Sequence, residues 1–344
     1  MKKTFGILSF AALLSLASCA KEEPVNSYKG DKISFRAEMG TRATETTNAN
    51  LNSIRVAAFL GNQTLFKDVD FNRGSDNVFT SNPEYYWPGD NSTLDFVAYA
   101  PASTGGTMSI EKDSKKLTDF SPAQNISDQI DFITSSASGS KETNEDSGME
   151  LVFDHRLSQI EINAKSENTA YIFKITGIRI GQPVSKGTYD FDSNNWSLDS
   201  EKAIYEETYT TPVTLTADPV NVMGAGGNAI LIPQQLTGWD PESDAANNNQ
   251  GAYLSVKLQI NSQAGAQVYP FPGDANCTWA AIPIDTKWEP GKKYVYNLDL
   301  THGGGYVDPK DPQPGKPVLG GPIKFTVDVT DWSPSQVDTP MKTN

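Results

Sequence analysis

The stretch Lys32-Ile33-Ser34-Phe35-Arg36-Ala37-Glu38-Met39-Gly40-Thr41-Arg42-Ala43 decides how this chain is interpreted. Its apolar residues, Ile33, Phe35, Ala37 and Met39, alternate with polar ones, which is the period of a half-buried β-strand. A polar run follows Arg42, so a trypsin-like or Arg-specific protease could cut the Arg42–Ala43 bond and release this strand. A sheet that loses an edge strand exposes an apolar groove and unpaired backbone groups. The stretch therefore predicts a groove that accepts a strand from another chain.

Composition excludes some functions. The chain has 344 residues, of which 37% are hydrophobic and 10% aromatic, enough to form the cores of two ordinary domains. Its formal net charge is −14. Because an acidic surface repels phosphate backbones, we expect no nucleic-acid partner.

The first residues indicate export. A basic start precedes an apolar run that is too short to span a bilayer comfortably, and small residues follow it. Leu16-Ala17-Ser18-Cys19 resembles the bacterial lipoprotein box, in which the cysteine is acylated. We therefore expect a signal peptide over 1–19, lipidation at Cys19 and a durable anchor in the outer membrane, because acyl chains partition into bilayers.

Strand signals dominate the remaining sequence, and no stretch sustains a helical period. Many short strands separated by turn residues predict an all-β protein, and the length suggests two β-sandwiches in tandem. We expect a propeptide carrying the first strand over 20–42, an N-terminal sandwich over 43–149 and a C-terminal sandwich over 150–344. The polar run 135–148 would be a linker or a long loop.

The segment 302–322 is unusually rich in glycine and proline, so we expect a flexible tether. A strand over 323–329 follows it, in which Ile323, Phe325, Val327 and Val329 alternate with polar residues. This strand has the pattern and the slack to fill the groove of a neighbouring copy, which makes it the candidate donor strand. The alternative is that it crosses back into its own sheet through a long loop.

Several motifs in order resemble the fimbrillins, the pilus subunits of Bacteroidales. The resemblance spans nearly the whole chain and is carried by the lipoprotein box, by the strand closed by Thr41-Arg42-Ala43, and by Tyr85-Tyr86-Trp87-Pro88, Leu94 to Pro101, Asp128 to Phe132, Leu151 to Leu157 and Asp331-Trp332. It implies two transthyretin-like sandwich domains, export as a surface lipoprotein, cleavage at Arg42–Ala43 by an Arg-specific protease, and assembly by donor-strand exchange with other subunits of an adhesive fimbria. It leaves a stalk, anchor or tip role open.

Residues for catalysis are scarce. The only histidines are His155 and His302, and Cys277 is the only cysteine besides Cys19, so the sequence predicts no enzyme, no cofactor and no metal site. Cys277 is expected in the core, because Trp279 and Ala281 continue its pattern. Asp190, Asp192, Asn194 and Glu201 partly match a calcium loop, but the turn glycine is missing and a hairpin is favoured.

Two classes of function therefore remain. The first is the structural subunit of a fimbria. The second is a monomeric surface lipoprotein, or a tip adhesin, that binds a glycan or host ligand through some of its six Trp and thirteen Tyr residues. Aromatic residues at alternating strand positions usually belong to a core, which favours the first class.

Overall fold

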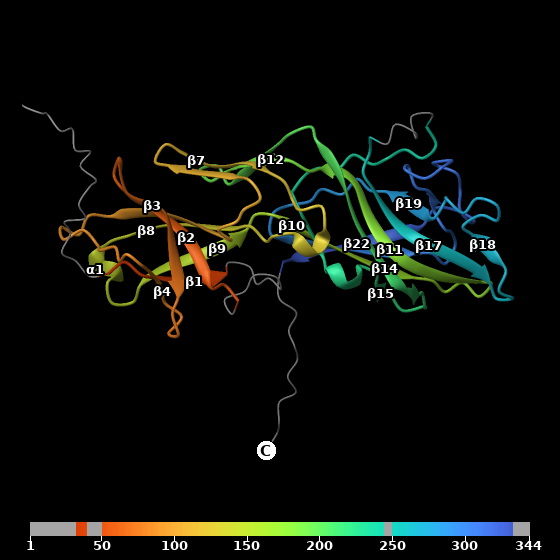
Figure 1. The fold of residues 1–344 in the computed structure, drawn as a ribbon, viewed down its shortest axis with the longest axis horizontal. Coiled ribbons are helices and arrows are strands. Elements are labelled where there is room, and N and C mark those ends of the chain that lie inside the picture. Colours follow the sequence, from red (N-terminus) through yellow and green to blue (C-terminus); the bar gives the residue numbers. More distant parts are fainter. Residues whose placement is uncertain (1–31, 40–49, 244–249, 333–344) are drawn as a thin grey trace, which may run out of the picture.

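The computed structural model describes residues 32–39, 50–243 and 250–332. Within these ranges nearly all regular structure is β-strand, and the helices are α1 (Lys141–Asn144), η1 (Ile126–Asp128) and η2 (Gly224–Gly226). The predicted all-β class is therefore confirmed. Figure 1 shows two lobes side by side along the long axis of the molecule, with the N-terminal half of the chain in the first lobe.

A closed barrel forms the first lobe. In hydrogen-bonding order its strands are β1 (Phe35–Met39), β4 (Phe79–Ser81), β3 (Gln63–Arg73), β2 (Ser53–Leu60), β5 (Leu94–Ala100), β8 (Ile133–Gly139) and β9 (Met149–His155). The ring closes because β9 pairs with β1. Side chains from all around the ring, including Phe35, Phe71 and Phe96, fill its interior as one buried cluster.

A smaller sheet covers part of the barrel. It is four-stranded and contains β6 (Thr107–Glu111), β7 (Ser114–Phe120), β12 (Gly187–Asp190) and β13 (Asn195–Leu198), in the order β13-β12-β7-β6. Phe59 of β2 and Val97 of β5 share one buried cluster with Leu117 and Tyr189 of this sheet. Strands β2 and β5 are thus covered on both faces, which explains why their sequences are almost continuously apolar.

Two sheets form the second lobe around the largest core. The first, five-stranded, contains β10 (Ser158–Lys165), β15 (Val220–Asn221), β16 (Ala229–Leu231), β20 (Lys292–Asp299) and β22 (Lys324–Asp331). The second, six-stranded, contains β11 (Tyr171–Val184), β14 (Lys202–Thr214), β17 (Tyr253–Ser262), β18 (Gln267–Tyr269), β19 (Trp279–Pro283) and β21 (Tyr306–Val307). Residues of both sheets, such as Ile162 and Ile178, belong to the same buried cluster. A transthyretin-like topology for each lobe stays a prediction.

The sheets divide the chain later than the expected boundary at 149. The polar run 135–148 belongs to the first lobe, because it contains part of β8 and the helix α1. Met149–His155 is a barrel strand, whereas Ser158–Lys165 belongs to the second lobe. The hairpin β12–β13 then returns to pair with β7 of the first lobe. The second half of the chain therefore contributes two strands to the first lobe.

The expected flexible tether over 302–322 is wrong, because this segment is folded against the second lobe. The amide of Gly304 donates to Leu319 O at 2.7 Å, and the amide of Val318 donates to Gly305 O at 2.9 Å. Val307 and Val318 are buried in the core. A Cβ added at Gly303 would collide with the carbonyl oxygen of Gly321, so glycine serves close packing of two backbone segments.

Charged groups also fasten this segment. Asp308 is fully buried and forms an ion pair with Arg179, with 2.8 Å between Nη1 and Oδ1. Arg179 also contacts Glu206 at 2.9 Å, and its guanidinium lies 4.1 Å from the centre of the Trp279 ring. Because removing one partner of a buried ion pair leaves an uncompensated charge, this contact holds the segment firmly in place.

Cys277 lies in the core of the second lobe, as predicted. Its thiol contacts Pro312 O, an atom of the same glycine- and proline-rich segment, at 2.9 Å. Burial, together with the neighbouring Asp274, raises the pKa of the Cys277 thiol to about 11. The thiol is therefore protonated at neutral pH and chemically quiet.

The position of Phe35 in the barrel predicts a large effect on stability. In the uncut chain, Phe35→Ala should lower the free energy of unfolding by about 3–5 kcal/mol, because it leaves a cavity among aromatic rings. Urea denaturation followed by circular dichroism measures this. The exposed neighbour offers a matched control, since Arg36→Ala should change stability by less than about 0.5 kcal/mol. Equal effects of the two variants would contradict the buried placement of Phe35.

Candidate functional site

The first strand is part of the barrel wall, and its apolar face completes the core as the sequence predicts. Ile33 and Phe35 are buried, Ala37 and Met39 are half-buried, and Arg36 and Glu38 are exposed. The Phe35 ring meets Phe71 and Phe96 edge-on, with centroid distances of 4.8 Å and 5.1 Å. Such edge-to-face contacts stabilise beyond simple burial. Phe35 is therefore the main apolar anchor of the strand.

The two sides of β1 are held unequally. On one side it pairs in parallel with β9 along its whole length, from Phe35↔Met149 to Met39↔Phe153. On the other side it pairs with β4 at one position, Phe35↔Phe79. No other described strand connects β4 to β9. Removing β1 would therefore open the barrel and leave the backbone groups of β9 without partners.

The residues directly before β1 are fixed by backbone contacts. The amide of Ile33 donates to Tyr85 O at 2.8 Å, and the amide of Met149 donates to Ser34 O at 2.8 Å. Lys32 adds an exposed ion pair with Glu84, which contributes little in water. The other candidate residues of this region, Cys19, Arg42 and Ala43, lie outside the described residues.

The candidate donor strand lies at the edge of its own sheet. It is β22, and it pairs with β20 from Lys324↔Asp299 to Asp331↔Lys292. The strand thus crosses back into its own sheet, which is the alternative that the sequence left open. Its apolar residues are unevenly covered, since Ile323 is buried, Phe325 and Val327 are half-buried, and Val329 is 51% exposed. From Phe325 to Val329 the strand is therefore held to its own lobe mainly by backbone pairing.

Sequence reasoning missed the residue that anchors the end of this strand. Trp332 is fully buried, its amide donates to Gly291 O at 2.9 Å, and its ring stacks on His155 at 4.5 Å. A tryptophan directly after a mostly exposed strand was the available signal. Here it closes the strand with a large apolar contact between the lobes.

Strand β9 brings the two candidate segments together. Its residues 149–153 pair with β1, and its last residue, His155, lies against Trp332 at the end of β22. His155 is fixed in turn by Asp131, whose Oδ1 is 2.8 Å from Nδ1 of the imidazole, and both side chains are buried. With an aromatic ring on its face and a carboxylate at its edge, His155 has a packing role.

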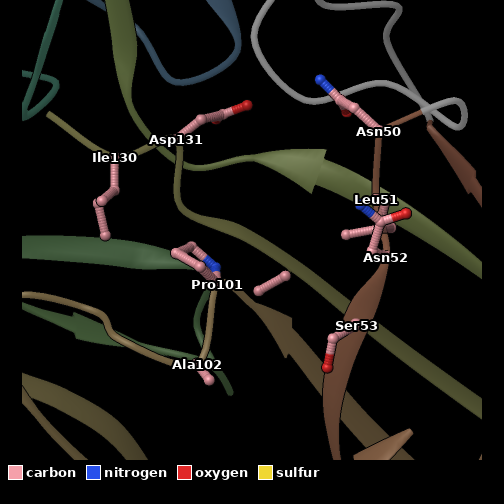
Figure 2. A pocket seen from close by; sticks show the side chains of 9 residues that line it. Asn50, Leu51, Asn52, Ser53, Pro101, Ala102, Ile130 and Asp131 are labelled. Atoms are coloured by element: carbon pink, nitrogen blue, oxygen red, sulfur yellow. The ribbon is translucent and has the colours of Figure 1, made fainter. Parts of the chain in front are cut away.

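A pocket of ≈ 440 Å³ lies beside the paired His155 and Asp131. Figure 2 shows Asn50–Ser53, at the start of β2, across from Pro101, Ala102, Ile130 and Asp131. None of its lining residues is aromatic, so it offers no stacking surface for a sugar. Its one charged side chain, Asp131, already binds His155.

Neither a metal centre nor an exposed aromatic platform occurs in the part of the chain that the structure describes. In that part, no group of three or more His, Cys, Asp or Glu residues is placed to hold a metal ion. The Asp190 loop is the favoured hairpin, because the amides of Asp192 and Ser193 donate to Asp190 Oδ1 at 3.0 Å. These hydrogen bonds lower the pKa of Asp190. Every described Trp, Tyr and Phe is buried or half-buried.

Over residues 32–39, 50–243 and 250–332, helices are all too short or too polar to cross a membrane.

Comparison with known proteins gives a consistent result. The sequence model of a family described as fimbrillin-like matches residues 41–332. The fold is similar to a fimbrial protein from Bacteroides vulgatus ATCC 8482, with a TM-score of 0.60 and 16% identity over 88% of this chain and 100% of that one. It is also similar to a protein from Parabacteroides distasonis ATCC 8503 assigned to cell adhesion, with a TM-score of 0.51 and 10% identity over 89% and 98% of the two chains. No curated protein matches this chain.

The buried position of Trp332 predicts that it restrains β22. In Trp332→Ala, amide exchange over Lys324–Asp331 should accelerate by more than about tenfold, a factor that corresponds to a loss of about 1.4 kcal/mol. Hydrogen exchange read by mass spectrometry measures this. Val329→Ala is the control, because that side chain is mostly exposed and its removal should leave exchange unchanged. Unchanged protection in Trp332→Ala would show that backbone pairing alone holds the strand.

Proposed function

The chain belongs to the fimbrillin-like family, and from this membership we propose that it is a structural subunit of a cell-surface fimbria that polymerises by strand exchange and supports adhesion. The observation that carries the proposal is the position of β1. It alone connects β4 to β9 among the described strands, and it comes directly before the predicted cleavage site at Arg42–Ala43.

Maturation would proceed in two steps. The precursor is anchored in the outer membrane through acyl chains on Cys19, which hold the chain at the surface. An Arg-specific protease then cuts the Arg42–Ala43 bond, and the lipid-bearing propeptide with its strand leaves the rest of the subunit. The cut is needed because β1 keeps its place between β9 and β4 in the intact chain.

Loss of β1 leaves a groove that requires a replacement. The groove would be lined by buried apolar side chains of the barrel: Phe71, Phe79, Phe96, Met149, Leu151 and Phe153. The amides and carbonyls of β9 that now pair with β1 would also face it. Leaving buried backbone groups unpaired is costly, and burial of apolar surface stabilises a structure by about 25 cal/mol per Å². An incoming strand with alternating apolar residues therefore satisfies both needs.

The C-terminal strand of a second copy is suited to this role. Its apolar residues Phe325, Val327 and Val329 are incompletely covered in their own sheet, so they gain burial on moving into a closed barrel. Complete burial of side chains of this size contributes roughly 1.5–3 kcal/mol each, before ordering costs. Because the segment before β22 is fastened through Asp308 and by backbone hydrogen bonds as far as Gly321, the strand would leave its lobe by losing its pairing with β20 and withdrawing the buried Ile323.

Cleavage at Arg42 gives one test. Arg42→Ala should accumulate an uncut chain that keeps β1 and stays monomeric, whereas the wild-type chain should begin at Ala43 in assembled fibres. N-terminal sequencing and size-exclusion chromatography measure these two properties. Finding the peptide that begins at Cys19 within assembled fibres would contradict the proposed maturation.

The inward face of β22 gives a second test. Phe325→Asp combined with Val327→Asp should block polymerisation and leave the processed monomer folded, because both side chains are only half-buried in their own sheet. A matched control adds the same charges on exposed positions, with Thr326→Asp and Thr330→Asp. Ladders of polymers on gels measure assembly. Full-length fibres from the first double variant would mean that the donor strand lies elsewhere.

A further inference from the structure

The excised strand and the C-terminal strand share one pattern of side chains. The first reads Ile33-Ser34-Phe35-Arg36-Ala37-Glu38-Met39, and the second reads Ile323-Lys324-Phe325-Thr326-Val327-Asp328-Val329. In both, read from N to C, the apolar face begins with isoleucine, continues with phenylalanine and ends with two smaller or more flexible residues. Read in the opposite direction with the ends aligned, the two phenylalanines do not coincide, and the two-residue shift that would align them puts Gly321, which has no side chain, at the place of Met39.

The groove distinguishes these two directions. The site of Phe35 is fully buried and lies between Phe71 and Phe96, so it takes a flat aromatic ring. The site of Ala37 is only half-buried. A strand that places a smaller residue in the first site leaves a cavity there, and a strand that places phenylalanine in the second leaves that ring partly in water.

We infer that the C-terminal strand of one copy enters the groove of the next in the direction of the strand it replaces, parallel to β9, with Phe325 in the site of Phe35. This inference rests on the strand exchange proposed above, and it adds the direction and the register of the joint. Ile323 then takes the site of Ile33, and Val327 and Val329 take those of Ala37 and Met39.

The remaining positions fit this register. The change from Ala37 to Val327 adds volume while the change from Met39 to Val329 removes it, and cores tolerate swaps that conserve total volume. On the outer face, Glu38 is replaced by another acid, Asp328. Lys32 is replaced by Pro322, which loses an exposed ion pair with Glu84 but keeps the amide at the next position that donates to Tyr85 O.

Disulfide trapping in fibres made by cells that express the full chain tests direction and register. In the inferred register Asp328 lies next to Val152 of the acceptor, because Glu38 pairs with Val152. If the strand ran the other way with its ends aligned to the same groove, Lys324 would take that place. Thr326 would lie next to Glu150 in both of these arrangements, because Arg36 pairs with Glu150. Neighbouring strands are about 4.7–4.9 Å apart, within the range of Cα separations that a disulfide bridges.

Three double variants separate the outcomes. Glu150→Cys with Thr326→Cys reports whether the strand occupies the groove at all. Val152→Cys with Asp328→Cys should give a ladder of linked subunits on non-reducing gels that collapses to monomer on reduction. Its linkage should be more than about fivefold above that of Val152→Cys with Lys324→Cys. The opposite ranking of the last two would overturn the inferred direction while strand exchange stands. No linkage in the first variant, in fibres that still assemble, would overturn the inferred register, while strand exchange itself is tested separately by Phe325→Asp with Val327→Asp.

A variant without new cysteines provides an independent measurement. Exchanging the two side chains, with Phe325→Val and Val327→Phe, conserves composition and volume. In the inferred direction it empties the site of Phe35, so assembly of the processed chain should fall by more than about tenfold. In the opposite direction it would place phenylalanine in that site and assembly would rise. Unchanged or faster assembly would therefore overturn the inference.

Discussion

The packing of Phe35 between Phe71 and Phe96 is the contact on which the first lobe depends. The strand that carries it is only five residues long and is paired at one position on its β4 side. Its hold on the barrel therefore comes from the parallel ladder with β9 and from burial of its apolar face. A short strand attached in this way can be both essential to the core and removable by one cut outside it.

Strand β9 gives the two lobes a common element. It supplies the backbone partner of β1 and ends at His155, which lies under Trp332. The buried carboxylate of Asp131 fixes the imidazole from the side. The proposed groove is lined by the part of β9 that pairs with β1, and the proposed donor strand β22 is held near the other end of β9, at His155. Both therefore depend on the same seven-residue strand. Packing at either end acts on one rigid strand.

The sequence predicted those features that depend on local periodicity. The alternation from Ile33 to Met39 and from Ile323 to Val329 gave both strands, and the pattern around Cys277 placed it in the core. It did not reveal that 302–322 is folded, because glycine is compatible with flexibility and with close packing, and only tertiary contacts such as Asp308 with Arg179 decide between them. It also did not reveal that Met149–His155 closes the barrel, since strand partners far apart in the chain leave no local pattern.

The four-stranded sheet has a mechanical consequence for the proposed fibre subunit, which would be pulled from both ends. Its strands β6 and β7 come from the first half of the chain, and β12 and β13 come from the second. Tension along the long axis of Figure 1 would therefore load the hydrogen bonds between β7 and β12 as well as the covalent crossing near Arg156. Because the force is then carried both by the covalent chain and by the β7–β12 hydrogen bonds, the two lobes resist extension as one body, whereas two domains on a single linker would swing apart.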